Sequence, residues 1–226
     1  MLPVEIVEPF ERKFGGRILE GYGLTEATTV VSAHRVSGVR KLGSVGQPIP
    51  GVEVKILDDD DRELPRGDVG EICVRGPGVM LGYYRMPEET AKVVRNGWLH
   101  TGDVGRLDAD GYLYIVERKK DLIIRGGFNV YPRDVEEVLY AHPGIAEAAV
   151  VGERDPLMGE EVVAFVVLKP GAEAGADAII AFCRERLAKY KCPRRVRFLD
   201  SLPKSPVGKI LRKELRALTE SAPPRT

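Results

Sequence analysis

The residues whose chemistry is easiest to interpret lie between Gly97 and Tyr131. Asp103 ends the turn-like sequence Thr101-Gly102-Asp103, and its carboxylate can accept hydrogen bonds from both hydroxyls of a ribose. Arg118 carries a planar set of donors that suits hydroxyl, carboxylate or phosphate oxygens. Spacing alone favours a turn cap for Asp103 and a surface ion pair for Arg118, so a ligand site here needs further support.

Two further segments carry groups suited to a phosphorylated ligand. The first spans Gly21 to Glu26, and its glycines would allow the backbone to approach a ligand closely. Within it, Thr25 offers a hydroxyl to a phosphate and Glu26 offers the oxygen ligands that Mg²⁺ prefers. The second segment holds Lys209, whose ammonium on a long stem can neutralise charge developing on oxygen. By residue type alone, a Gly-rich loop explains the first segment equally well. A solvated basic tail explains the second segment better than a catalytic role does.

Taken in order, the three segments resemble the core motifs of the adenylate-forming superfamily, which includes acyl-CoA synthetases, carrier-loading adenylation domains and luciferases. The matching segments are Gly21-Tyr22-Gly23-Leu24-Thr25-Glu26, the stretch from Gly97 to Tyr131, and Pro203-Lys204-Ser205-Pro206-Val207-Gly208-Lys209-Ile210. The resemblance covers the chain from about Leu2 to about Leu218. Within the superfamily, the chain is most similar to a fatty-acid or aryl-acid CoA ligase.

The resemblance implies a role for each motif residue. The residues implied to bind the nucleotide are Gly21, Tyr22, Gly23, Thr25, Asp103 and Arg118. Tyr22 would stack near the adenine, Thr25 would lie at the AMP phosphate, and Glu26 would bind Mg²⁺. Lys209 would reach the substrate carboxylate and the α-phosphate, so the implied catalytic residues are Lys209, Thr25 and Glu26.

The implied reaction has two steps. A carboxylate attacks the α-phosphate of Mg-ATP to give an acyl-adenylate, and the CoA thiol then displaces AMP to give a thioester. The implied cofactors and substrates are ATP or AMP, Mg²⁺, CoA and a small-molecule carboxylic acid, whose identity the sequence does not reveal. The resemblance implies a role in fatty acid metabolism. The family alternates its small domain between two orientations. The pivot would fall at Lys120, and the Gly126-Gly127 turn would approach the pantetheine arm of CoA.

The patterning predicts an α+β protein. Alternating apolar residues with repeated glycine and proline predict a small barrel-like set of strands over about residues 43–115. The resemblance identifies residues 1–118 as the end of a large N-terminal domain and residues 119–218 as a small, mobile α+β C-terminal domain. Residues 219–226 are predicted to be a disordered tail.

Local signals predict the individual elements. They are a helix from Val4 to Phe14, a strand from Arg17 to Glu20, a helix from Pro87 to Val94, a hairpin turning at Asp110-Gly111, a strand from Leu122 to Ile124, a helix opening at Pro132, strands from Ala146 to Gly152 and Val162 to Leu168, a helix capped by Asp177, and a strand from Val196 to Leu199.

Composition narrows the function classes. Basic and acidic residues number 34 each, so neither nucleic acid nor an anionic membrane is expected as the main partner. The three cysteines form no CxxC pair, which fits a reducing cytosol and argues against disulfides or a zinc site. No apolar run has the length of a membrane span and no signal pattern opens the chain, so a cytoplasmic protein is expected. His34, His100 and His142 are too scattered to predict a metal triad.

One departure from the family is large. Full-length members carry an upstream Ser/Thr/Gly-rich phosphate loop with a lysine, and most of the acyl pocket, and no segment here matches that loop. We therefore expect a fragment, a truncated product or a chain whose N-terminal half is supplied separately, with homo-oligomer formation as another way to cover apolar surface near the N-terminus.

Three interpretations stay open. They are a CoA ligase or its C-terminal part, a carrier-protein-loading adenylation domain, and a non-catalytic AMP- or CoA-binding remnant. The cluster Arg118–Asp121 and the helix entry Phe128–Pro132 resemble ligases more than carrier-loading domains.

Overall fold

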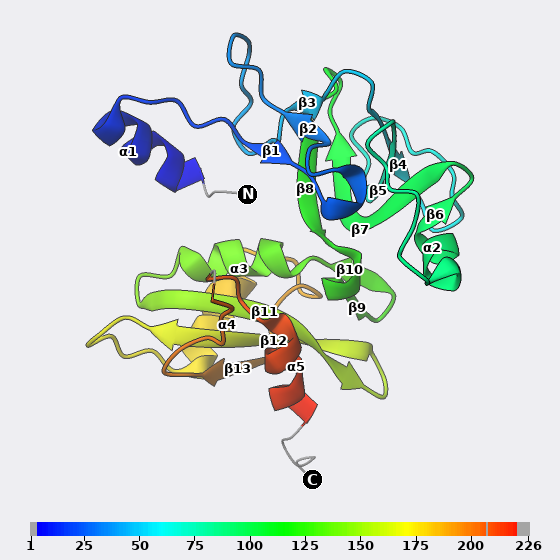
Figure 1. Cartoon of the computed structure of the whole chain (residues 1–226). Helices are drawn as coiled ribbons and strands as arrows, with labels where there is room; N and C mark the ends of the chain where they lie inside the picture. Colours follow the sequence, from blue (N-terminus) through cyan, green and yellow to red (C-terminus); the bar gives the residue numbers. More distant parts are fainter. Residues whose placement is uncertain (1–3, 207, 221–226) are drawn as a thin grey trace. The chain divides into compact units, whose positions relative to one another are not determined.

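The computed structural model describes residues 4–206 and 208–220 (Figure 1). The chain divides into two compact units, residues 1–119 and residues 120–226. This division lies one residue after the domain boundary expected from the sequence. Each unit contains both helix and sheet, so the predicted α+β class is confirmed. Among the described residues, no helix combines the length and apolar character needed to cross a bilayer.

The described part of the first unit contains two antiparallel sheets. Its elements are α1 (Val4–Phe14), β1 (Gly21–Tyr22), the 3₁₀ turn η1 (Thr25–Ala27), β2 (Ser32–Ala33), β3 (Gln47–Pro48), β4 (Glu53–Leu57), β5 (Gly70–Arg75), α2 (Pro87–Val93), β6 (Val94–Arg95), β7 (Trp98–Leu107) and β8 (Leu113–Arg118). A second 3₁₀ turn, η2 (Lys119–Asp121), spans the division between the units. The small sheet has the order β1-β2-β3, and the larger has the order β4-β5-β7-β6 with β8 also paired to β7. The larger sheet curls into half a barrel, as the sequence led us to expect (Figure 1).

The core of the first unit comes from the alternation of side chains along its strands. Ile56 of β4 and Ile72 of β5 lie opposite each other in the ladder, and both are buried. Leu99 of β7 and Leu113 of β8 join them in one apolar cluster. Because successive side chains of a strand point to opposite faces, the neighbouring residues Leu57, Cys73 and Trp98 form a second, smaller buried cluster on the other face.

The turn expected at Thr101-Gly102-Asp103 is instead a bulge inside the long strand β7. The register between β5 and β7 shifts between Glu71 and Cys73, so these three residues of β7 lie outside the β5–β7 ladder. Gly102 has a φ of +70°, a conformation that glycine adopts without strain. A bulge bends a strand and redirects the side chain beside it, and here the redirected side chain is Asp103.

The second unit has a sheet covered on both faces. Its elements are β9 (Ile123–Arg125), β10 (Phe128–Val130), α3 (Pro132–Tyr140), β11 (Ile145–Asp155), β12 (Gly159–Leu168), α4 (Ala176–Arg184), β13 (Arg195–Phe198) and α5 (Arg212–Glu220). The strand order is β10-β9-β12-β11, and β13 pairs parallel to β12. Alternate residues of β11 and β12 pack with α3 and α4 in one cluster and with Leu215 of α5 in another. Burial on both faces explains why β12 reads as a nearly continuous apolar run.

Most predicted elements are confirmed within a few residues of their expected bounds. They are α1, α2, the β7–β8 hairpin, β9, α3, β11, β12 and β13. Pro132 occupies the start of α3, and Val135 and Leu139, one helical turn apart, are buried.

The strand predicted at Arg17–Glu20 is wrong, because side chains satisfy its backbone groups. The N–H of Ile18 donates to a Glu11 carboxylate oxygen at 2.6 Å, and the carbonyl of Ile18 accepts from Arg40 at 2.8 Å. Arg40 also forms an ion pair with Glu11, so α1 and Arg40 hold this segment in place of a neighbouring strand.

Two predictions near helix ends also need correction. Gly175, not Asp177, occupies the N-cap of α4, and Asp177 lies in the first turn, where a carboxylate still interacts favourably with the helix dipole. Helix α5 continues to Glu220, so ordered structure extends two residues beyond the expected limit at Leu218. The rest of the predicted tail, residues 221–226, lies outside the described residues, as does Val207.

Gly46 offers a matched test of packing in the first unit. Its carbonyl accepts from the N–H of Leu113, and a Cβ at this position would lie 2.0 Å from the carbonyl carbon of Ala33. Gly43 has a similar φ, +74° against +79°, but nothing lies within 4 Å of its Cβ position. We expect Gly46→Ala to lower the free energy of unfolding by about 2–4 kcal/mol more than Gly43→Ala, as measured by urea denaturation. Equal losses for the two variants would show that the close approach at Gly46 is not a real constraint.

Candidate functional site

Asp103 lies where three strands of the first unit meet. It follows the bulge in β7 and lies opposite Arg118 of β8 in the ladder. The hydroxyl of Tyr22, in β1, donates to Oδ2 of Asp103 at 2.6 Å, and Nε of Arg118 lies 3.3 Å from Oδ1. The structure therefore brings together three residues of the predicted nucleotide site that are far apart in the chain.

Burial differs sharply across this group. The Asp103 side chain is 11% exposed, whereas the Arg118 side chain is 61% exposed. Burial raises the pKa of Tyr22, and the negative charge of Asp103 raises it further, so the phenol stays protonated and donates. The Tyr22 hydroxyl thus fixes the orientation of the Asp103 carboxylate, while most of the Arg118 guanidinium remains accessible to a ligand. The tyrosine hydroxyl as the orienting group was missed from the sequence, which indicated only ring stacking near adenine.

Thr25 and Glu26 lie in η1, which begins three residues after the end of β1. Thr25 is exposed and Glu26 is half-buried. The hydroxyl of Tyr83 donates to Oε1 of Glu26 at 2.9 Å, and the carbonyl of Glu26 accepts from the N–H of Met80 at 2.8 Å. The Glu26 carboxylate fits the needs of Mg²⁺, which binds through one or two carboxylates, keeps several waters and takes further ligands from phosphate oxygens.

Gly23 is required by the path of the chain itself. A Cβ at this position would lie 1.3 Å from the carbonyl oxygen of Thr29. Close approach to a ligand, which the sequence suggested for these glycines, is therefore not needed to explain Gly23. At Gly21 an added Cβ would lie 3.1 Å from the carbonyl oxygen of Ser32, a milder restriction.

The predicted catalytic lysine belongs to the second unit. Lys209 is exposed and follows Gly208, whose φ is +80°. The loop that carries it is closed by an antiparallel bridge between Lys204 and Ile210 and by a hydrogen bond from the N–H of Ser205 to the carbonyl of Lys209, at 2.8 Å. A closed loop of this kind presents the lysine side chain outward.

The glycine pair predicted near CoA forms the turn between β9 and β10. Gly126 and Gly127 have φ of +55° and +81°. The N–H of Gly126 donates to the carbonyl of Met158 at 2.7 Å, and a Cβ there would lie 2.7 Å from the Met158 methyl group. At Gly127 nothing lies within 4 Å. Lys120, the predicted pivot, is exposed in η2, and its carbonyl accepts from Arg216 at 3.1 Å.

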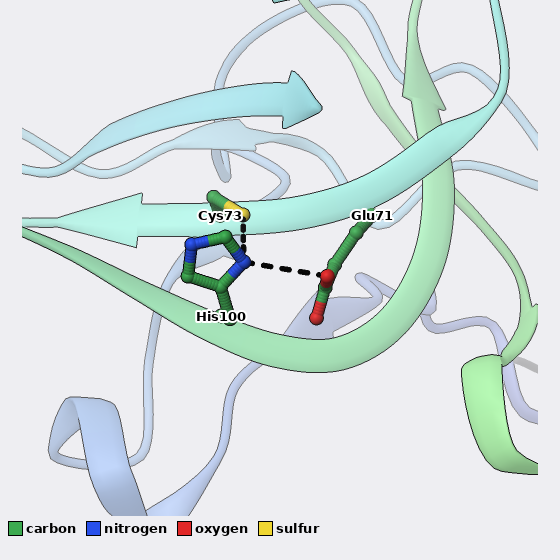
Figure 2. A group of neighbouring side chains, drawn as sticks. All are labelled: Glu71, Cys73 and His100. Atoms are coloured by element: carbon green, nitrogen blue, oxygen red, sulfur yellow. Dashed lines mark hydrogen bonds and ion pairs between the residues drawn. The ribbon is translucent and has the colours of Figure 1, made fainter. Parts of the chain in front are cut away.

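Sequence reasoning missed a buried cluster in the first unit, which consists of Glu71, Cys73 and His100 (Figure 2). Nδ1 of His100 lies 3.3 Å from Sγ of Cys73 and 3.3 Å from Oε2 of Glu71. The contact arises because the β5–β7 register places Cys73 opposite His100. Only strand pairing could reveal it, since the residues share no motif.

The cluster has the residue types of a metal site, but side-chain cations already contact its ligand atoms. Nζ of Lys119 lies 3.1 Å from Oε2 of Glu71, and a guanidinium nitrogen of Arg95 lies 2.9 Å from Nδ1 of His100. Burial and the nearby carboxylates raise the pKa of the Cys73 thiol to about 12, which keeps the sulfur protonated. The arrangement is a hydrogen-bonded network within the sheet, and Glu71 connects it to Gly102 in the bulge and to Lys119.

Comparison with known families agrees with the motif analysis. Residues 1–84 match the family described as AMP-binding enzyme, and residues 134–209 match the AMP-binding enzyme C-terminal domain. The chain belongs to the AMP-binding, adenylate-forming enzymes, and it corresponds to a C-terminal portion of them.

The relatives of this chain include acid–CoA ligases and a ligase that acts on an acyl carrier protein. The chain is 51% identical to a long-chain-fatty-acid–CoA ligase of Bacillus subtilis (strain 168) over 215 residues, which cover 95% of this chain and 38% of that protein. It is 47% identical over 199 residues to a fatty acid–[acyl-carrier-protein] ligase, ScoC, of Streptomyces coeruleorubidus, covering 86% of this chain and 38% of that one. The crystal structure of ATP-bound MatB from Rhodopseudomonas palustris matches with a TM-score of 0.91 and 40% identity, over 96% of this chain and 43% of that chain. The chain thus spans about two fifths of the length of the relatives it matches.

The cysteines provide a test of the buried network. Cys73, Cys183 and Cys192 are all buried, and burial raises the pKa of Cys73 to about 12 and that of Cys183 to about 11. Because the thiolate is the reactive form, we expect no rapid reaction with Ellman's reagent at about pH 8 in the folded chain, and reaction of all three thiols in denaturant. Rapid labelling of Cys73 in the folded protein, located by peptide mapping, would contradict the network described here.

Proposed function

We propose that this chain supplies the nucleotide-binding side and the mobile domain of an ATP-dependent acid–CoA ligase. The overall reaction converts a carboxylate, ATP and CoA to acyl-CoA, AMP and pyrophosphate. The observation that carries the proposal is the Asp103 carboxylate, buried and oriented by Tyr22 beside the exposed guanidinium of Arg118. ATP-bound MatB, similar over nearly the whole chain, supports a nucleotide as the ligand.

In the first step, Asp103 would accept the ribose hydroxyls and Arg118 would donate to ribose or phosphate oxygens. Thr25 would donate its hydroxyl to the α-phosphate, and Glu26 would hold Mg²⁺, which neutralises charge on the phosphate oxygens when bound. A carboxylate oxygen of the substrate attacks the α-phosphorus, and the bond from phosphorus to the pyrophosphate oxygen breaks. Lys209 would neutralise the negative charge that develops there.

In the second step, the CoA sulfur attacks the acyl carbon, and the bond from that carbon to the AMP oxygen breaks. The thiol proton passes to solvent, and AMP leaves. The second unit would turn at Lys120 between the steps, moving Lys209 away and bringing the Gly126-Gly127 turn to the pantetheine arm. Gly127 suits this role because the space around its Cβ position is open.

The rest of the ligase is proposed to come from an upstream portion. The phosphate loop and most of the acyl pocket would lie there, so these residues do not identify the acid. A fatty acid is favoured, because the B. subtilis relative is a long-chain-fatty-acid–CoA ligase. We place the protein in the cytoplasm on the basis of its composition and cysteine usage. Either self-association or an N-terminal half of the ligase would cover the apolar side chains of α1.

A second candidate function is loading of an acyl carrier protein, which the similarity to ScoC favours. The two functions share the adenylation step and differ only in the thiol that accepts the acyl group. Supplying CoA and a carrier protein in parallel distinguishes them. A third possibility, a remnant that binds AMP without catalysis, predicts nucleotide binding with neither thioester.

Substitution of Lys209 separates the two half-reactions. With Mg-ATP, CoA and short, long and aromatic acids, the chain together with a phosphate-loop portion of a ligase should form acyl-CoA detectable by mass spectrometry. Lys209→Ala should slow adenylation by roughly 10²–10³-fold while sparing thioester formation from supplied acyl-adenylate, because its charge serves the first step alone. Asp103→Ala should impair both half-reactions, since both use the bound nucleotide.

Lys213→Ala, which removes an exposed lysine of α5, serves as the control and should leave both rates unchanged. Equal loss of both half-reactions in Lys209→Ala would contradict the role assigned to this lysine. Product formation that survives Asp103→Ala would contradict the proposed nucleotide site itself.

A further inference from the structure

Each neighbour of Lys120 belongs to an ion pair that has one buried carboxylate. Lys119 pairs with Glu71, with Nζ 3.1 Å from Oε2, and Asp121 pairs with Arg216, with a guanidinium nitrogen 2.8 Å from Oδ1. The carboxylate side chains are 8% and 9% exposed, whereas the Lys119 and Arg216 side chains are 43% and 31% exposed. The first pair lies within the first unit and the second pair lies within the second unit.

The Glu71–Lys119 pair, which we call the first anchor, also holds the bulge beside Asp103. Oε1 of Glu71 accepts from the N–H of Gly102 at 3.1 Å, and Oε2 faces His100 (Figure 2). Burial opposes ionisation of Glu71, but Lys119, His100 and the Gly102 N–H together keep its pKa below the ordinary value. One ionised carboxylate therefore ties the end of the first unit to the strand segment that presents the nucleotide carboxylate.

The Asp121–Arg216 pair, the second anchor, is fixed to the core of the second unit. Arg216 lies in α5 and donates both to Asp121 and to the carbonyl of Lys120, at 2.8 and 3.1 Å. Its neighbour Leu215 is fully buried in the cluster that α5 forms with β11 and β12. The guanidinium therefore holds the start of the second unit against a helix that cannot shift without opening the core.

Lys120 lies between these anchors with an exposed side chain. We propose that Glu71 and Arg216 are positioning residues that bind the two neighbours of Lys120 to opposite units, so that the domain rotation is confined to the backbone of Lys120. This inference rests on the alternation included in the proposed function. Because Glu71 also holds Gly102, the rotation would leave the Asp103 carboxylate in place. An ion pair with a buried member is suited to this task, since removing one partner leaves an uncompensated charge.

Hydrogen–deuterium exchange of peptides covering residues 117–123 tests the anchors directly, in the chain without ATP, CoA or acid. Glu71→Gln, Lys119→Met and Arg216→Gln should each speed exchange there by about tenfold, the scale expected when a buried pair loses a partner. Peptides from β5 and β12 should change by less than about twofold, showing that the fold is intact. Arg216→Lys, which keeps the charge but loses the planar fork, should restore part of the protection.

Two controls are matched to these variants. Asp59→Asn removes the other carboxylate that pairs with Lys119, one whose side chain is 91% exposed, and an exposed pair contributes little. Lys213→Gln removes an exposed cation from α5. Neither should alter exchange in residues 117–123. If Glu71→Gln does not fold, Lys119→Met decides the question, because it breaks the same pair from its half-exposed side.

Unchanged exchange in folded Lys119→Met and Arg216→Gln would overturn the proposal, as would equal acceleration by Asp59→Asn. In the ligation assay, the anchor variants should lower kcat while leaving the KM for ATP within about twofold, because the nucleotide contacts themselves remain. Unchanged kcat would also overturn it. Absence of product from the unsubstituted chain in that assay, with the phosphate-loop portion supplied, would instead count against the proposed function. The exchange result would still test the two anchors independently.

Discussion

The hydrogen bond from Tyr22 to Asp103 is the interaction on which the candidate site depends. Burying a carboxylate is costly unless strong donors compensate it, and here the phenol and the Arg118 guanidinium do so from two other strands. The bulge at Gly102 takes Asp103 out of the β5–β7 ladder, while Asp103 still pairs with Arg118 in the β7–β8 ladder. The carboxylate thus links β1, β7 and β8 and gives the first unit a preorganised acceptor.

Much of the second unit follows from local sequence. The apolar runs in β11 and β12 predict strands buried on both faces, and the clusters on the two sides of the sheet explain why no polar alternation interrupts them. Pro132 with the stripe Val135 and Leu139 likewise predicts α3, because a proline in the first turn and apolar residues one turn apart are sufficient signals.

The rest depends on contacts between residues distant in sequence, which periodicity does not encode. The segment Arg17–Glu20 has the composition of a strand, yet Glu11 and Arg40 satisfy the backbone of Ile18 instead. The same limit applies within the site. The motifs named Asp103 and Arg118, but the hydroxyl of Tyr22 and the network around Glu71 emerge only from strand register.

The most direct test of the account is a crystal structure of the chain grown with AMP. The account predicts the ribose hydroxyls within hydrogen-bond distance of the Asp103 carboxylate, with the hydroxyl of Tyr22 still bound to the same side chain and Arg118 turned toward the nucleotide. AMP bound elsewhere, with Asp103 in contact with protein groups alone, would contradict the central claim that this carboxylate is the nucleotide's anchor.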